Sequence, residues 1–152
     1  MKLLEQIGPP DLKLGPLAVW VHGRQFEDSQ DFWDGNWLRV TVHCGAKGGE
    51  VTISGTFVRV TELIAWAKEC QGLLDNVSDT AELPTLEPNL TVEMKLDQLG
   101  HVETTVEISP DHLTQEHTFR FEVGLSDLPP LISAINGIAG RFAERGVTER
   151  VV

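Results

Sequence analysis

Residues 38–57 read LRVTVHCGAKGGEVTISGTF, and this stretch decides the fold class. Apolar side chains occupy every second position from Leu38 to Cys44, which is the pattern of a β-strand with one buried face. The alternation resumes at Val51 and continues to Phe57 after the glycine-rich segment 45–49. Two alternating runs joined by a short glycine-rich loop predict an antiparallel hairpin.

The same two-residue period predicts four more strands, at residues 17–22, 90–96, 102–108 and 118–123. Short turns join most of the neighbouring strands, which favours antiparallel pairing. Residues 75–88 contain two prolines and no clear period. We expect a loop there, with at most a short extended piece at residues 86–87.

Apolar residues at spacings of three and four predict two helices. The first covers residues 61–74 with Thr61 as its N-cap, and the second runs from Ser126 to a stop at Gly146. Pro129 and Pro130 fall in the first turn of the second helix, where proline is tolerated. The predicted fold class is therefore α+β, a mainly antiparallel sheet of about six strands packed against two α-helices.

The chain of 152 residues is predicted to form one domain spanning residues 1–152. We expect an irregular lead-in at residues 1–16, which are rich in glycine and proline, and a C-terminal tail at residues 147–152. Cys44 and Cys70 form no CxxC pair, so two buried free thiols are expected. We find no signal peptide and no apolar run of membrane-spanning length, so we predict a cytoplasmic protein without membrane contact.

The acidic charge is concentrated in one part of the chain. The sequence holds 12 Lys and Arg against 23 Asp and Glu, a net charge of −11. Between Glu69 and Asp127 there are 13 acidic residues and two basic ones, so this segment carries the whole excess. Nucleic-acid binding is disfavoured because it needs clustered Lys and Arg. A basic protein partner fits the charge, although solubility alone also explains it.

Strand alternation places several carboxylates of this segment on outward faces. Glu93 shares a face with Asp97, and Glu103 shares one with Glu107. We define the acidic patch as these four residues and Glu122, and we predict that it binds a cationic protein partner. The alternative is an ordinary solvated sheet face.

An unusual aromatic turn precedes the strand at residues 38–44. The marker turn, as we call it, comprises Asp31, Trp33, Asp34, Gly35, Asn36 and Trp37. Asp, Gly and Asn favour tight turns, whereas tryptophan favours cores or interfaces. We expect Trp33 and Trp37 to anchor the turn in the core while Asp31 and Asp34 cap it.

No residue pattern predicts catalysis, a metal site or a cofactor. The five histidines lack metal-ligand spacing, and the carboxylates between Glu27 and Asp34 lack the spacing of a calcium loop. Neither Ser29 nor Cys44 lies in the setting of an activated nucleophile, and the loop 45–49 lacks the end of a phosphate-binding loop.

The run Asp31 to Leu38 resembles the WapI-type immunity proteins, which are small cytoplasmic antitoxins paired with bacterial contact-dependent toxins. Shorter similarities occur at residues 86–88, 100–102 and 125–128, and the resemblance spans roughly residues 17–145. It implies a non-enzymatic protein that binds and blocks the toxic domain of a cognate secreted protein, often a nuclease. It carries over no catalytic motif and no map of contact residues.

Two other functions stay open on the sequence alone. One is a structural or regulatory subunit that assembles through a sheet edge or a helix. The other is an enzyme that uses the carboxylates between Glu27 and Asp34, for which the sequence offers no supporting motif. The oligomeric state is also open.

Overall fold

The computed structural model describes residues 4, 6–46 and 48–146, and it confirms the α+β class. In this described part of the chain, eight strands form two antiparallel sheets of four strands each, in place of the single sheet of about six that we predicted. The first sheet contains, in spatial order, β1 (Leu12–Leu14), β2 (Leu17–Arg24), β3 (Trp37–Ala46) and β4 (Gly49–Arg59). The second contains β5 (Thr80–Leu83), β6 (Leu90–Leu96), β7 (His101–Ile108) and β8 (Thr118–Gly124).

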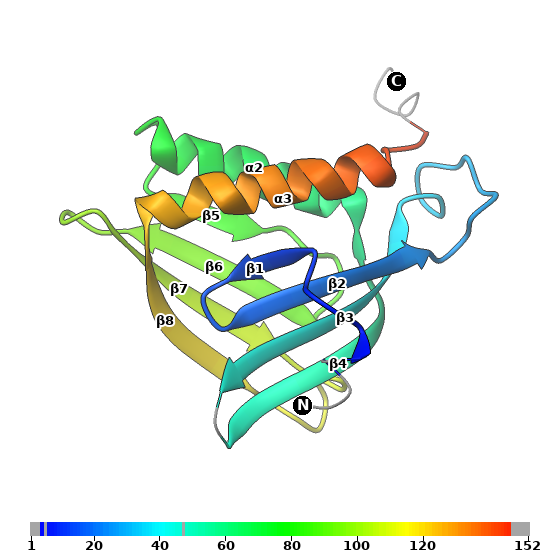
Figure 1. Ribbon diagram of the computed structural model, residues 1–152, viewed down its shortest axis with the longest axis horizontal. Helices are drawn as coiled ribbons and strands as arrows, with labels where there is room; N and C mark the ends of the chain where they lie inside the picture. Colours follow the sequence, from blue (N-terminus) through cyan, green and yellow to red (C-terminus); the bar gives the residue numbers. More distant parts are fainter. Residues whose placement is uncertain (1–3, 5, 47, 147–152) are drawn as a thin grey trace.

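The two predicted helices, α2 (Val60–Leu74) and α3 (Leu128–Arg141), lie side by side across the top of both sheets (Figure 1). A short 3-10 turn, η1 (Leu125–Asp127), leads from β8 into α3. One hydrophobic core joins residues of both sheets and both helices. No helix among the described residues is long and apolar enough to cross a membrane.

The chain passes from the first sheet to the second through α2. β4 ends at Arg59, α2 begins at the next residue, and β5 then pairs only with β6. The carboxylate of Glu62 is buried at this junction and accepts hydrogen bonds from the backbone N–H groups of Arg59 and Leu86, each 2.8 Å long. It also pairs with the Arg59 guanidinium at 3.0 Å. Glu62 therefore connects the end of β4, the start of α2 and the loop before β6.

Two short strands were missed by the sequence analysis. β1 lies inside the lead-in at residues 1–16 that we expected to be irregular, and Leu12 and Leu14 on it are buried against β2. β5 lies at residues 80–83, where a loop was predicted, and residues 86–87 form no strand. Both strands are too short to show a convincing period. The predicted tail at residues 147–152 lies outside the described residues.

The helix ends also differ from the prediction. α2 starts at Val60 with Arg59 as its N-cap, not at Thr61, because Glu62 binds the N–H of Arg59. Ser126 lies in η1, and Asp127 is the N-cap of α3. α3 stops at Arg141, five residues before Gly146, because the segment after it bonds to the loop between β2 and β3.

The two free cysteines are fully buried in the core. Cys70 on α2 lies beside Met94 of β6, whose sulfur also accepts a hydrogen bond from Trp66 Nε1 at 3.3 Å. Burial raises the pKa of Cys44 to about 11 and the pKa of Cys70 to about 12.

We therefore expect both thiols to resist alkylation in the folded protein. Because the thiolate is the reactive form, iodoacetamide at pH 8 should label them at least about 100-fold more slowly than free cysteine. Mass spectrometry of timed reactions measures this. In guanidinium chloride both should react at the ordinary rate, whereas rapid labelling of the native protein would contradict the burial.

Candidate protein-binding site

The acidic patch lies on the outer face of the second sheet. The side chains of Glu93, Glu103, Glu107 and Glu122 are exposed, and Asp97, just beyond the end of β6, is half-buried. The neighbouring positions Val92, Met94, Val102, Val106 and Val123 are buried in the core. The two-residue period of the strands separates these two sets of side chains.

The strand register sets like charges opposite one another on this face. Glu103 on β7 is paired with Glu122 on β8, and Glu82 on β5 is paired with Glu93 on β6. Like charges directly across two strands destabilise the pairing. Lys95, opposite Glu103, and Arg120, opposite Thr105, offset only part of the negative charge.

A groove of about 520 Å³ crosses part of the patch. Glu93 and Glu103 line it together with Lys95, Glu69 of α2 and Glu82 of β5. Glu69 and Glu82 were not predicted as site residues. The short alternation at residues 80–83 could have indicated that Glu82 faces outward on a strand. No local pattern indicated that Glu69, on a helix, would reach this face of the sheet. Glu107 lies apart from this groove and lines a second hollow with Thr91 and Thr118.

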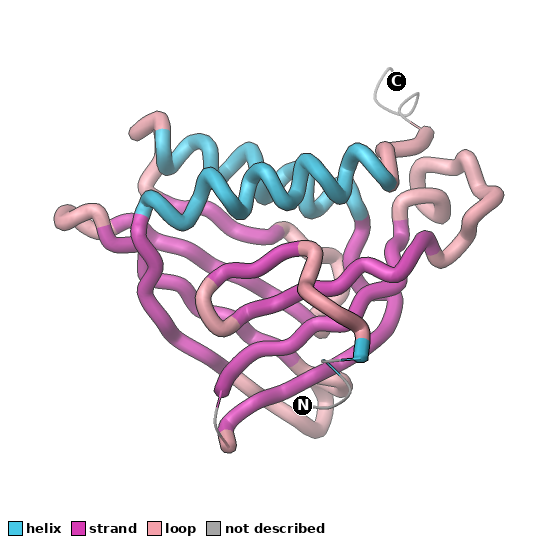
Figure 2. Tube along the Cα trace, viewed as in Figure 1, coloured by secondary structure: helices cyan, strands magenta, loops and turns pink. Residues whose placement is uncertain are grey.

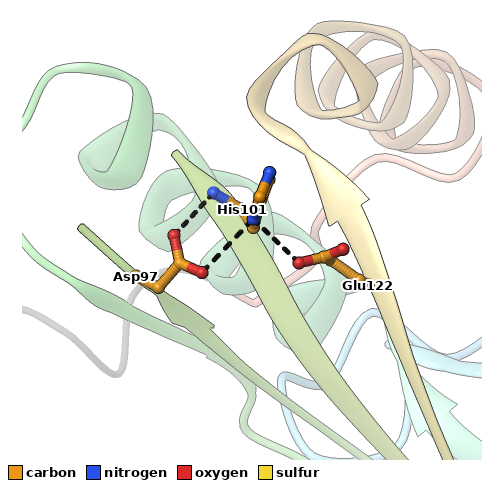
Figure 3. Close-up of side chains that lie close together, drawn as sticks. All are labelled: Asp97, His101 and Glu122. Atoms are coloured by element: carbon orange, nitrogen blue, oxygen red, sulfur yellow. Dashed lines mark hydrogen bonds and ion pairs between the residues drawn. The ribbon is translucent and has the colours of Figure 1, made fainter. Parts of the chain in front are cut away.

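Asp97, His101 and Glu122 meet at the end of the β6–β7 hairpin (Figure 3). His101 Nδ1 lies 3.4 Å from a carboxylate oxygen of Asp97 and 3.0 Å from one of Glu122. The other oxygen of Asp97 accepts the backbone N–H groups of His101 at 2.9 Å and Leu99 at 2.8 Å. The N–H of His101 is the largest of the effects that lower the pKa of Asp97, and the N–H of Leu99 and the His101 imidazole add to it.

This trio is the one group in the described part of the chain that brings three potential metal-ligand atoms within 4.8 Å of one another. The carboxylates between Glu27 and Asp34 do not converge in this way. His101 and Glu122 are exposed and already in contact, so the geometry identifies a polar cluster that ties the hairpin to β8.

The outer face of the first sheet is less open to a partner. Trp20, Thr41 and His43 on that face are buried. Trp20 donates its indole N–H to the carbonyl oxygen of Gly8 at 2.8 Å, and Leu4 packs against it. The central part of this face is therefore covered, whereas the acidic face of the second sheet is open across its strands.

The marker turn lies in the loop between β2 and β3, at residues 25–36, and Trp37 begins β3. Asp31 accepts the backbone N–H groups of Trp33 at 2.9 Å and Asp34 at 3.0 Å. A Cβ at Gly35 would lie only 2.6 Å from the carbonyl oxygen of Asp31, so this turn requires glycine. Trp37 is half-buried, with the Arg59 guanidinium 5.4 Å from its ring centre.

In the described part of the turn no hydrogen bond reaches the Asp34 carboxylate, so of the two predicted caps only Asp31 acts as one. The prediction was also wrong for Trp33. Its side chain is 60% exposed instead of anchored in the core, and the carboxylate of Asp34 is exposed as well. The buried anchor is Asn36, whose exposed fraction is 0%. Asn36, and not Trp33, therefore holds the loop in place.

The loop lies beside the segment that follows α3 (Figure 2), and hydrogen bonds clasp the two together. The Asn36 amide donates to the carbonyl oxygens of Phe32 and Arg145, and its oxygen accepts the N–H of Arg145. The Arg145 guanidinium donates to the carbonyl oxygens of Glu27 and Ser29. Arg24 donates to Gly35 at 2.7 Å and to the carbonyl oxygen of Ala143 at 2.6 Å.

Replacing Asn36 with alanine should therefore destabilise the fold by about 3 kcal/mol, because several polar groups lose their partners in a buried place. Urea unfolding followed by fluorescence measures the change. Asn136→Ala is the matched control, since Asn136 is exposed on α3 and should change stability little. Equal effects of the two substitutions would show that the clasp contributes nothing.

The lowered pKa of Asp97 predicts that the stability of the protein depends on pH. A lowered native pKa means that charged Asp97 stabilises the fold above its ordinary value of 3.8 and that this stabilisation is lost as the pH falls through the native pKa. Asp97→Asn keeps an acceptor oxygen but removes the charge. It should melt below the wild type at pH 7, and the difference should shrink below pH 3.8. A difference that stays constant with pH would contradict the interaction.

Comparison with known proteins gives one match. No curated protein and no solved structure matches the chain. The immunity protein WapI-like family matches over residues 11–143. This range includes the acidic patch, the marker turn and the helices α2 and α3. The chain therefore belongs to the WapI-like family of immunity proteins, and this membership indicates a role in immunity against a toxin.

Proposed function

We propose that this protein binds the toxic domain of a cognate bacterial toxin and neutralises it without catalysis, using the acidic face of the second sheet. The observation that carries the proposal is the exposed acidic patch in a member of an immunity protein family. The toxin domain it fits is one with a basic surface.

The strand register supports a cationic partner more strongly than composition alone does. The like-charge pairs Glu103 with Glu122 and Glu82 with Glu93 raise the energy of the free protein. Basic side chains placed between them would turn this repulsion into attraction. Binding of such a partner would therefore remove a destabilising interaction that is present in the free protein.

Electrostatic attraction also suits the kinetic demand on an immunity protein. A field of one sign steers an oppositely charged partner and raises the association rate by roughly 10- to 1,000-fold at low salt. Fast capture matters because a free toxin acts until it is bound. We further propose that this happens in the cytoplasm, and two free buried cysteines fit a reducing compartment.

The first test is protection and binding. The candidate toxin is to be sought in the genes beside this one, as the C-terminal domain of a large secreted protein. Co-expression with this chain should restore growth to cells that produce that domain, and the purified proteins should form a complex. Failure of both, together with a stable homo-oligomer by native mass spectrometry, would favour the structural-subunit alternative.

The acidic patch itself is tested by the triple variant Glu93→Gln, Glu103→Gln and Glu122→Gln. Its association rate with the toxin domain should fall by about tenfold at low salt, and its salt dependence should be weaker. Stopped-flow or surface plasmon resonance at two ionic strengths measures both. The melting temperature should change little, because relief of the repulsion between neighbouring strands offsets the loss of the exposed contact between His101 and Glu122.

The control for this experiment removes carboxylates away from the patch. Glu87→Gln with Asp75→Asn removes two negative charges, against three in the triple variant, at positions on other parts of the surface. If this control slows association as much per charge as the triple variant does, then net charge acts instead of the patch.

A further inference from the structure

We propose that the β2–β3 loop, residues 25–36, is a second contact surface for the same toxin domain. In it Trp33 enters an apolar pocket of the toxin while the surrounding carboxylates pair with cationic side chains. The inference rests on the proposed function, because it assigns to the toxin a contact beyond the acidic patch.

The loop presents large aromatic side chains to solvent. Trp33 is 60% exposed and Phe26 is 46% exposed, and among the described residues they are the two aromatic side chains in the set of exposed large hydrophobic ones. Phe32 packs edge-on against Trp33, with ring centres 5.0 Å apart and ring planes at 89°. Burial of an exposed tryptophan by a partner is strongly favourable, and tryptophan is among the residue types most enriched in binding hot spots.

The frame that carries Trp33 is already ordered. Asp31 binds the N–H of Trp33, and the carbonyl oxygen of Asp31 accepts the N–H of Gly35 at 2.7 Å. Beneath the turn, Arg24, Asn36 and Arg145 hold the backbone through the clasp described above. A preorganised side chain loses little conformational entropy on binding, so more of the burial energy is available as affinity.

Charge selects the kind of partner. Residues 25–36 contain Glu27, Asp28, Asp31 and Asp34, all exposed, and no Lys or Arg. The guanidinium groups nearby, of Arg24 and Arg145, donate inward to backbone carbonyl groups of the clasp. The surface is therefore an aromatic centre with an acidic rim.

This combination excludes the other occupants on physical grounds. An acidic rim repels the anionic surface of a bacterial membrane. A second copy of the loop related by twofold symmetry would place four carboxylates against four carboxylates, a like-charge contact that costs energy. A basic protein surface with an apolar pocket satisfies both the rim and the centre.

The experiment compares Trp33→Ala with Leu113→Ala in binding to the candidate toxin domain defined above. Leu113 is 82% exposed on the loop between β7 and β8, so its removal also takes away one exposed apolar side chain. Trp33→Ala should raise the Kd by at least about 30-fold, as expected for a hot-spot residue, mainly through faster dissociation. Leu113→Ala should leave the Kd within about twofold.

Stability is measured on the same proteins. Because Trp33 lies outside the core, Trp33→Ala should keep a melting temperature close to that of the wild type. If the variant unfolds, the charge reversal Asp34→Lys replaces it, since it leaves both hydrogen bonds to the Asp31 carboxylate in place. It should weaken toxin binding and not alter the melting temperature.

The outcomes separate this inference from the proposed function. If the wild type binds the toxin domain and Trp33→Ala binds it with the same affinity, the loop contact is overturned and the proposed function stays intact. No binding by the wild type overturns both. A wild-type dimer that Trp33→Ala converts to a monomer, seen by light scattering, shows that a second copy occupies the loop and also overturns the inference.

Discussion

The buried carboxylate of Glu62 holds the point at which the chain leaves one sheet for the other. It binds Arg59 at the end of β4, starts α2, and fixes Leu86 ahead of β6. A buried charge without partners would be very costly, but here the backbone and the guanidinium satisfy it. Since no described residue pairs one sheet with the other, their relative position depends on this junction and on the core beneath the helices. The exposed acidic face exists because the second sheet is held in this place.

The sequence predicted most of the fold where the pattern was long and regular. Six strands and two helices follow from apolar positions that repeat every two residues or every three to four residues. The short strands β1 and β5 and the division into two sheets were missed, since strands of three and four residues show too few repeats and pairing depends on distant segments. The observed helix ends differ from the predicted ones because Glu62 and Asn36 bind partners that no local pattern reveals.

The candidate site shows the same limit at the level of single residues. Alternation was enough to place Glu93, Glu103, Glu107 and Glu122 on the outer face. Their neighbours Glu69 and Glu82, and the contact of His101 with Asp97 and Glu122, depend on the tertiary structure. In the marker turn, residue type suggested that tryptophan would be the anchor. The structure gives that role to Asn36, because an amide can satisfy three backbone groups at once in a space where an indole would leave them unpaired.

The two proposed surfaces act over different ranges, and this difference makes them separable. Exposed charges act across about 8–10 Å at ordinary ionic strength, so the acidic patch affects mainly how fast a basic partner arrives. Trp33 acts only on contact, so it affects mainly how long the partner stays. Asn36 lies between these roles, since it stabilises the fold and also holds the loop that carries Trp33. A change at Asn36 therefore couples stability to binding, whereas a change at Trp33 separates them, because the clasp bonds to the backbone of the loop and leaves the exposed indole outside the core.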